Sequence, residues 1–237
     1  MEAWLEFLRG PVFRFALAVA VLGLARQLAL GVLGAVSAYR RANDKNVPWR
    51  QLAVQTAGWL VPVRRLFTSE RKVHGFLSFL LHVGVIVAPL FLIDHLLLWS
   101  RGLGVDLRFL ALPKVLIDHL TLLAVAAALG LILSRALSRT ARSISGFTDY
   151  FLLVLIVVLF MSGFVASRPW NPVSWEAGML IHVATGNLIL VLMPFTKLAH
   201  IVLFPWLRLT GEVAWKFPSR AGEEVALTLE GKEVRPI

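Results

Sequence analysis

The sequence predicts an all-α integral membrane protein, a bundle of five transmembrane helices. Hydrophobic residues make up 58% of the 237-residue chain, and the mean hydropathy is +0.75, whereas soluble domains are about 45–50% apolar. Apolar runs of roughly 20 residues, long enough to cross about 30 Å of hydrocarbon, recur along the chain. Together they occupy more than half of it, which favours one membrane domain.

Five apolar stretches define the expected spans. They lie at 13–38, 76–99, 115–134, 150–167 and 178–206. The first run is long and lacks a small-residue cleavage site, so it indicates a span and not a signal peptide. We therefore expect a membrane domain over 1–210 and a polar tail over 211–237. The segment 48–67 mixes Trp and Leu with Arg, which predicts a short helix on the inner leaflet; an ordered loop is the alternative.

The basic residues predict the orientation. The net charge is +10, and most of it lies in the connections 39–73 and 135–142 and in the tail. The opposite side holds only Arg9, Arg101, Arg108, Lys114 and Arg168. The positive-inside bias then places the N-terminus outside and the C-terminus in the cytoplasm, in an inner (cytoplasmic) membrane. Because topology accounts for the charge, the charge does not indicate nucleic-acid binding.

The chain has no cysteine. Disulfides, covalently attached haem, iron–sulfur ligation and a cysteine nucleophile are therefore excluded within it. Any redox cofactor must be held by histidine or belong to a partner.

Four histidines within the spans form two expected pairs. Intramembrane histidine is costly and indicates function. His182 and His200 are 18 residues apart, which is five helical turns, so both are expected on one face about 27 Å apart. His82 and His95 on the second span are about 20 Å apart. In antiparallel spans, His82 meets His200 near one surface and His95 meets His182 near the other, as two stacked b-type haems require.

The pairing requires that the second span is not a straight helix. Thirteen residues turn a straight helix by about 220°, which aims His82 and His95 at different faces. Pro89 lies between them, and a proline kink or local unwinding can reset the phase.

Charged residues within the spans are candidate partners of haem propionates. Arg14 and Arg26 lie on the first span, and Lys197 precedes His200 by three residues. A propionate is anionic, so a nearby guanidinium or ammonium is expected. For Arg26 the alternatives are an ion pair with Asp94 or snorkelling.

Glycines near the histidines allow close approach of a flat macrocycle. Gly84 and Gly186 follow His82 and His182, and Gly163 lies on the fourth span. Small-residue contacts between helices are the alternative. The lone His74 is expected to be interfacial, and His119 beside Asp118 is either a satisfied pair or part of a proton-handling site.

Motifs on three spans carry a family resemblance. S-F-L-L-H-V-G at 78–84, G-F-T-D-Y-F-L-L at 146–153, and L-I-H-V-A-T-G with L-M-P-F-T-K-L-A-H at 180–186 and 192–200 resemble the membrane gamma subunit of respiratory nitrate reductases and related cytochrome b subunits. The resemblance implies two haem b groups, held by His82 with His200 and by His95 with His182. In the nitrate reductase pattern the histidines of the second span are closer than 13 residues.

The same resemblance implies a quinol site near the outer haem, at the start of the third span. The nitrate reductase subunit has lysine there, whereas this chain has Asp118 and His119, with Lys114 nearby. The expected function is oxidation of menaquinol or ubiquinol, with electrons passing to a cytoplasmic iron–sulfur subunit and a catalytic subunit of a redox complex. The alternatives are quinone reduction by the same cytochrome, a subunit that binds haem but no quinone, and a haem-free transporter or scaffold.

Overall fold

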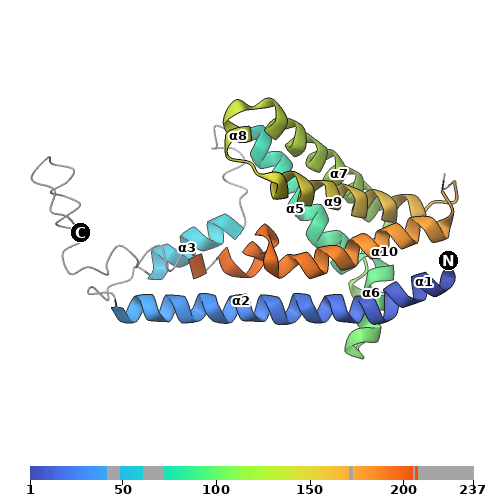
Figure 1. Cartoon of the computed structure of the whole chain (residues 1–237), viewed down its shortest axis with the longest axis horizontal. Coiled ribbons are helices and arrows are strands. Elements are labelled where there is room, and N and C mark those ends of the chain that lie inside the picture. Colours follow the sequence, from blue (N-terminus) through green and yellow to red (C-terminus); the bar gives the residue numbers. More distant parts are fainter. Residues whose placement is uncertain (42–48, 61–71, 171–172, 205, 208–237) are drawn as a thin grey trace, which may run out of the picture. The chain divides into compact units, whose positions relative to one another are not determined.

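The computed structural model describes residues 1–41, 49–60, 72–170, 173–204 and 206–207. All regular secondary structure in these ranges is helical. The α-helices are α1 (Glu2–Phe7), α2 (Phe13–Arg41), α3 (Trp49–Leu60), α5 (Lys72–Phe91), α6 (Ile93–Leu103), α7 (Lys114–Leu137), α8 (Arg139–Ser143), α9 (Phe147–Ala166) and α10 (Trp175–Leu192) (Figure 1). The π-helix η1 (Leu8–Val12) and the 3₁₀ helices η2 (Arg108–Leu110), η3 (Met193–Phe195) and η4 (Lys197–Ala199) complete the set.

Five helical segments in the described part of the chain are long and apolar enough to cross a membrane. They are Glu2–Arg40, Lys72–Phe91, Lys114–Leu137, Phe147–Ala166 and Trp175–Phe195. The all-α, multi-pass prediction is therefore confirmed, while the orientation of the termini stays a prediction. The segment 48–67 is helical over Trp49–Leu60, which favours a helix over a loop there. Its remainder and the tail 211–237 lie outside the described residues.

The chain divides into two compact units. Unit 1 comprises Met1–Leu17 and Pro62–Leu190, and unit 2 comprises Ala18–Val61 and Val191–Ile237.

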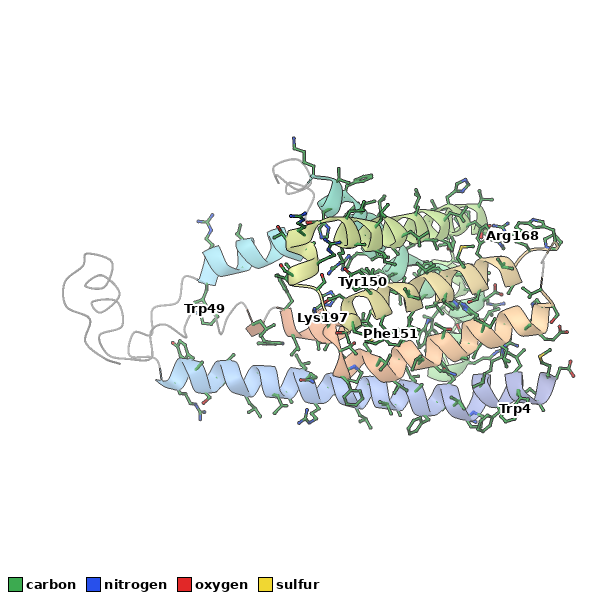
Figure 2. All side chains as sticks on the ribbon, turned by 45° about the horizontal axis from the view of Figure 1, so that its top comes forward. Trp4, Trp49, Tyr150, Phe151, Arg168 and Lys197 are labelled. Carbon is green, nitrogen blue, oxygen red and sulfur yellow. The ribbon has the colours of Figure 1, made fainter. Side chains whose placement is uncertain are left out.

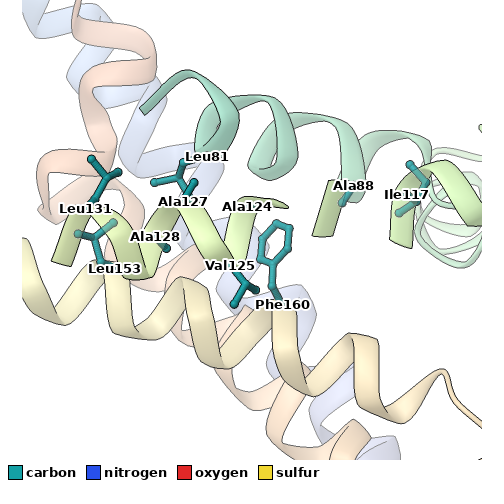
Figure 3. Packing of buried hydrophobic residues seen from close by; sticks show 10 residues of the cluster. All are labelled: Leu81, Ala88, Ile117, Ala124, Val125, Ala127, Ala128, Leu131, Leu153 and Phe160. Atoms are coloured by element: carbon teal, nitrogen blue, oxygen red, sulfur yellow. The ribbon is translucent and has the colours of Figure 1, made fainter. Parts of the chain in front are cut away.

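The core of unit 1 is the packing of α7 between α5 and α9 (Figure 3). Small side chains on α7 let the neighbouring backbones approach, as is typical of helix contacts in membranes. Gly84 of α5 has no Cβ, and the Ala124 methyl of α7 occupies the space that a Cβ would need. The buried apolar cluster consists of Leu81, Ala88, Ile117, Ala124, Val125, Ala127, Ala128, Leu131, Leu153 and Phe160.

Gly84→Ala is expected to loosen this packing. The added methyl carbon would lie 2.5 Å from the Ala124 Cβ and 3.2 Å from the Leu120 carbonyl oxygen, and neither atom can rotate away. Overpacking of this kind costs about 1–3 kcal/mol, so the variant should unfold at a lower temperature in detergent. Gly34→Ala is the matched control, because a Cβ at Gly34 meets no atom within 4 Å. Equal melting temperatures for the two variants would contradict the prediction.

The expected second span is broken into two helices. Pro89 lies inside α5, which ends at Phe91, and Leu92 is extended with φ −72° and ψ 131° before α6 begins. Proline has no N–H and its ring crowds the preceding turn, so the helix weakens here. Figure 1 shows α6 leaving the axis of α5. The second span is thus interrupted at Leu92, three residues after the proline, and a phase that suits both histidine pairs stays a prediction.

The expected fifth span is also shorter than 178–206. Helix α10 ends at Leu192, and η3, which contains Pro194, follows. Thr196 is extended with φ −126° and ψ −175° before η4. Within unit 2, Gln27 of α2 donates its side-chain amide to the Pro194 carbonyl at 3.1 Å, and a Cβ at Gly23 would meet the Pro194 ring at 2.5 Å. The break is therefore packed closely against α2.

Candidate functional site

His95 on α6 is held against the end of α5. Its Nδ1 lies 3.2 Å from the Ala88 carbonyl oxygen, and Trp99, one turn further on, donates its indole N–H to the Pro89 carbonyl at 3.0 Å. A carbonyl oxygen only accepts, so Nδ1 carries the proton and Nε2 keeps its lone pair. Trp99 therefore binds the Pro89 carbonyl beside the break, and the Ala88 carbonyl, which also accepts from the Leu92 N–H at 3.1 Å, fixes the direction of the His95 ring.

His182 on α10 packs against one turn of α9. Its Nδ1 donates to the Leu159 carbonyl at 2.9 Å, which again leaves Nε2 as the acceptor. A Cβ at Gly163, one turn after Leu159, would lie 2.7 Å from Cε1 and 2.8 Å from Nδ1 of His182. Real Cβ atoms do not approach other atoms so closely, so this ring position requires glycine at 163.

The imidazole rings of His95 and His182 lie parallel and close together. Their ring centroids are 6.0 Å apart and their planes differ by 1°. Two imidazoles that bind one metal ion from opposite sides through Nε2, each at about 2 Å, have ring centres roughly 6 Å apart. Metal-binding histidines almost always donate their other N–H to a carbonyl or carboxylate, as both rings do here. The structure thus brings together His95 and His182, the pair that the sequence predicted.

The donor set suits haem better than a metal bound by protein alone. In the part of the chain that the structure describes, no group of three or more His, Cys, Asp and Glu residues could hold a metal ion. A metal site built from protein needs three or four such ligands. Haem brings its own four nitrogens and takes only axial ligands from the protein, so two histidines suffice.

The other predicted pair belongs to different units. His82 lies in unit 1 and His200 in unit 2, so their pairing stays a prediction. Each ring is held locally: Nδ1 of His82 donates to the Ser78 carbonyl and Nδ1 of His200 to the Lys197 carbonyl, both at 2.7 Å. The expectation that His182 and His200 project from one face of a continuous helix is wrong, because α10 ends at Leu192.

The predicted propionate partners are distributed between the units. Arg26 and Lys197 belong to unit 2, whereas His95, His182 and Asp94 belong to unit 1, so the roles of Arg26 and Lys197 stay predictions. Arg14 lies in unit 1, with Nη2 3.9 Å from the Cβ position of Gly10 on its own helix segment. Its role also stays a prediction.

Asp118 at the start of α7 is an ion-pair centre. Its Oδ2 lies 3.0 Å from Lys114 Nζ and 2.8 Å from Arg168 Nη2. Lys114 also donates to the Ser167 hydroxyl at 3.4 Å. Figure 2 shows Arg168 where α9 runs into the connection to α10. The carboxylate of Asp118 therefore forms two ion pairs, one with Lys114 on its own helix and one with Arg168, just after α9.

His119 is more accessible than its neighbour. It is exposed, and its Nδ1 donates to the Val115 carbonyl at 2.6 Å, so Nε2 is free to accept a proton. An open pocket of about 270 Å³ adjoins it, lined by Val115, Asp118, His119, Leu122 and Arg168. Two of the three predicted quinol-site residues, Asp118 and His119, line this pocket, and Lys114 adjoins it through its ion pair with Asp118.

The two glycines predicted to contact haem have different surroundings. Gly84 packs against α7, which is the small-residue alternative. A Cβ at Gly186 would meet only Leu159 Cδ1, at an ordinary contact of 3.6 Å. Contact of either glycine with haem stays a prediction.

Three residues matter more than the sequence suggested. In the sequence analysis, Arg168 and Arg9 served only as basic residues of the outer side, and Gly163 served only as a small residue of the fourth span. Arg9 lies 5.4 Å from the Trp175 ring centroid and within electrostatic range of His182. Leu159 and Gly163 are one helical turn apart. This spacing does not indicate a contact with His182 unless α10 is already known to pack against that turn.

Comparisons with known proteins place the chain in a family. No family model matches it, and no solved structure matches it. A protein of Nitratidesulfovibrio vulgaris (strain Hildenborough), whose name states no activity, is 35% identical over 155 residues, which cover 65% of this chain and 67% of the relative. The chain therefore belongs to one family with this Nitratidesulfovibrio vulgaris protein.

Proposed function

We propose that the protein is a membrane cytochrome b that transfers electrons between quinol and a partner subunit. The observation that carries the proposal is the pair His95 and His182, with parallel rings 6.0 Å apart and both Nδ1 atoms bonded to backbone carbonyls. Haem bound by this pair supplies reversible one-electron transfer. The His82 and His200 pair is proposed to hold a second haem b.

The chain's own residues orient the ligands and exclude water from them. The Ala88 and Leu159 carbonyls fix the tautomers of His95 and His182, and Gly163 admits the His182 ring. Both rings are partly buried. Ligands held in this way favour one metal geometry before the cofactor binds.

Quinol oxidation is proposed at the pocket beside His119. Oxidation of a quinol releases two electrons and two protons. We assign both protons to His119 Nε2, which would accept the first and pass it to water before it accepts the second. The two electrons would pass one at a time to the haem proposed at His95 and His182. Asp118, held by Lys114 and Arg168, stabilises the protonated imidazole next to it.

Following the positive-inside bias, we propose that this pocket lies on the outer side of an inner membrane. Electrons then cross toward a cytoplasmic iron–sulfur subunit, and the terminal chemistry belongs to a further catalytic subunit. Each electron that crosses carries about 2.3 kcal/mol per 100 mV of membrane potential, so the arrangement conserves energy. The motif resemblance to nitrate reductase gamma subunits supports this proposal and is independent of the ring geometry.

The test of the proposal is the haem content of the purified, full-length protein. A dithionite-reduced spectrum with a b-type α band is expected, and extraction should yield two haem b per chain. One haem per chain that is lost in His182→Asn would retain His95 with His182 and reject His82 with His200. A colourless, folded protein would reject the cytochrome and favour the haem-free transporter or scaffold.

His119→Ala is expected to slow haem reduction by added quinol. Loss of a positioned general base typically costs 10²–10⁴-fold, so the initial rate in stopped-flow should fall by about that factor. Dithionite, which needs no base, should reduce the variant as fast as the parent. An unchanged quinol rate would exclude His119 as the proton acceptor.

A further inference from the structure

The N-terminal helix of unit 1 contains a π-helical turn that α10 holds in place. Pro11 lies within η1 and has no N–H for the regular helical bond. Asn187 of α10, only 5% exposed, donates its side-chain amide to the Leu8 carbonyl at 3.0 Å. Such π-turns occur often at functional sites. This one fixes the orientation of Arg9, which it carries, relative to α10.

The Arg9 guanidinium is positioned, but it forms no ion pair with any carboxylate in the described part of the chain. Its Cζ lies 5.4 Å from the Trp175 ring centroid, a cation–π contact that leaves its hydrogen-bond donors available. Among the residues that the structure describes, no carboxylate lies within ion-pair distance of it. An arginine within a candidate span is costly unless it has a partner.

The place of Arg9 relative to His182 matches the reach of a bound haem. Trp175 is the first residue of α10, and His182 follows seven residues later, about 10 Å along the helix. Tryptophan at a span end marks the interface. Arg9 therefore lies between the His95 and His182 pair and the membrane surface, which is where the carboxylates of a haem reach toward water.

We propose that Arg9 binds a propionate of the haem held by His95 and His182. This inference rests on the proposed function and deepens it by naming a residue that binds a propionate carboxylate of the haem. The guanidinium fork matches a carboxylate geometrically and carries its charge permanently. The Arg9 guanidinium is held in place by the η1 turn, by the hydrogen bond from Asn187 to Leu8 and by the Trp175 ring.

The test is a redox titration of the purified cytochrome with Arg9→Gln. Removing a cation beside the haem favours the oxidised, more positive form, so the midpoint potential should fall. A tenfold change in the equilibrium, which is 59 mV for one electron, is the expected scale. Arg9→Lys keeps the charge and should restore most of the potential. Arg101→Gln, on α6 itself, makes the same change in net charge and should leave the potential near that of the parent.

The outcomes separate this inference from the proposed function. A parent protein without haem would overturn both. A haem-containing parent whose potential and haem retention are equal in Arg9→Gln and Arg101→Gln would overturn the Arg9 assignment alone. Loss of a co-purifying anionic phospholipid from Arg9→Gln, with the potential unchanged, would also overturn it and identify a lipid headgroup as the anion.

Discussion

His182→Asn is expected to abolish haem binding at the pair while leaving the fold intact. The asparagine amide can take the place of Nδ1 and keep the hydrogen bond to the Leu159 carbonyl, but it has no atom at the position of Nε2. Loss of residues that merely orient a ligand typically costs 10–100-fold in metal affinity, so loss of the ligand itself should cost more. The α band assigned to this haem should disappear from the reduced spectrum.

His95→Asn should have the same result, because the two rings would share one iron. The asparagine can still donate to the Ala88 carbonyl. Gel filtration in detergent should show unaltered elution for both variants. His74→Ala is the control, since His74 lies at the start of α5 outside the pair, and it should retain the full spectrum.

Added imidazole distinguishes ligation from a structural role. A free imidazole that enters the space vacated in His182→Asn should restore low-spin haem absorbance. The haem-free alternative also accommodates parallel rings at this spacing, since parallel-displaced aromatic rings have centroids about 4.5–7 Å apart. It differs in the spectrum: if both asparagine variants absorb as the parent does, the pair does not bind haem.

Gly163→Ala is the second substitution with a large expected effect. The new methyl carbon would lie 2.7–2.8 Å from two atoms of the His182 ring, so the ring must leave its place on α9. The move breaks the Nδ1 bond to Leu159 and changes the position of the His182 ring relative to His95. Overpacking costs about 1–3 kcal/mol, and if that cost falls on haem binding the affinity drops roughly 5- to 150-fold.

The measurement for Gly163→Ala is haem retention during dilution in detergent, followed by absorbance. Gly34→Ala is the matched control, because its Cβ would meet open space. If the two variants retain haem equally, then either the His182 ring does not rest on Gly163 or its position is unimportant for haem. His182→Asn with Gly163→Ala should lose no more haem than His182→Asn alone, because both act through one ring.

Hydropathy alone determined the membrane class and the five crossings. A span of roughly 20 apolar residues is set by the bilayer thickness and needs no knowledge of neighbours. The pairing of His95 with His182 was also predictable, since antiparallel spans bring their corresponding ends together. The sequence further showed that a straight second span could not place His82 and His95 on one face, and it identified Pro89 as the residue able to change that.

Tertiary structure decided where the helices break and which groups meet there. Proline weakens a helix, but a break at Leu92 also requires hydrogen-bond donors for the carbonyls that lose their helical partners. The Trp99 indole N–H binds the Pro89 carbonyl, and the Leu112 N–H binds the Phe91 carbonyl. The same holds for Pro194, whose carbonyl bonds to Gln27 of another helix. The continuous fifth helix failed as a prediction because helical periodicity contains no information about such distant donors. Gly163, Arg9 and Arg168 gained their significance for the same reason: each acts on a residue far from it in sequence.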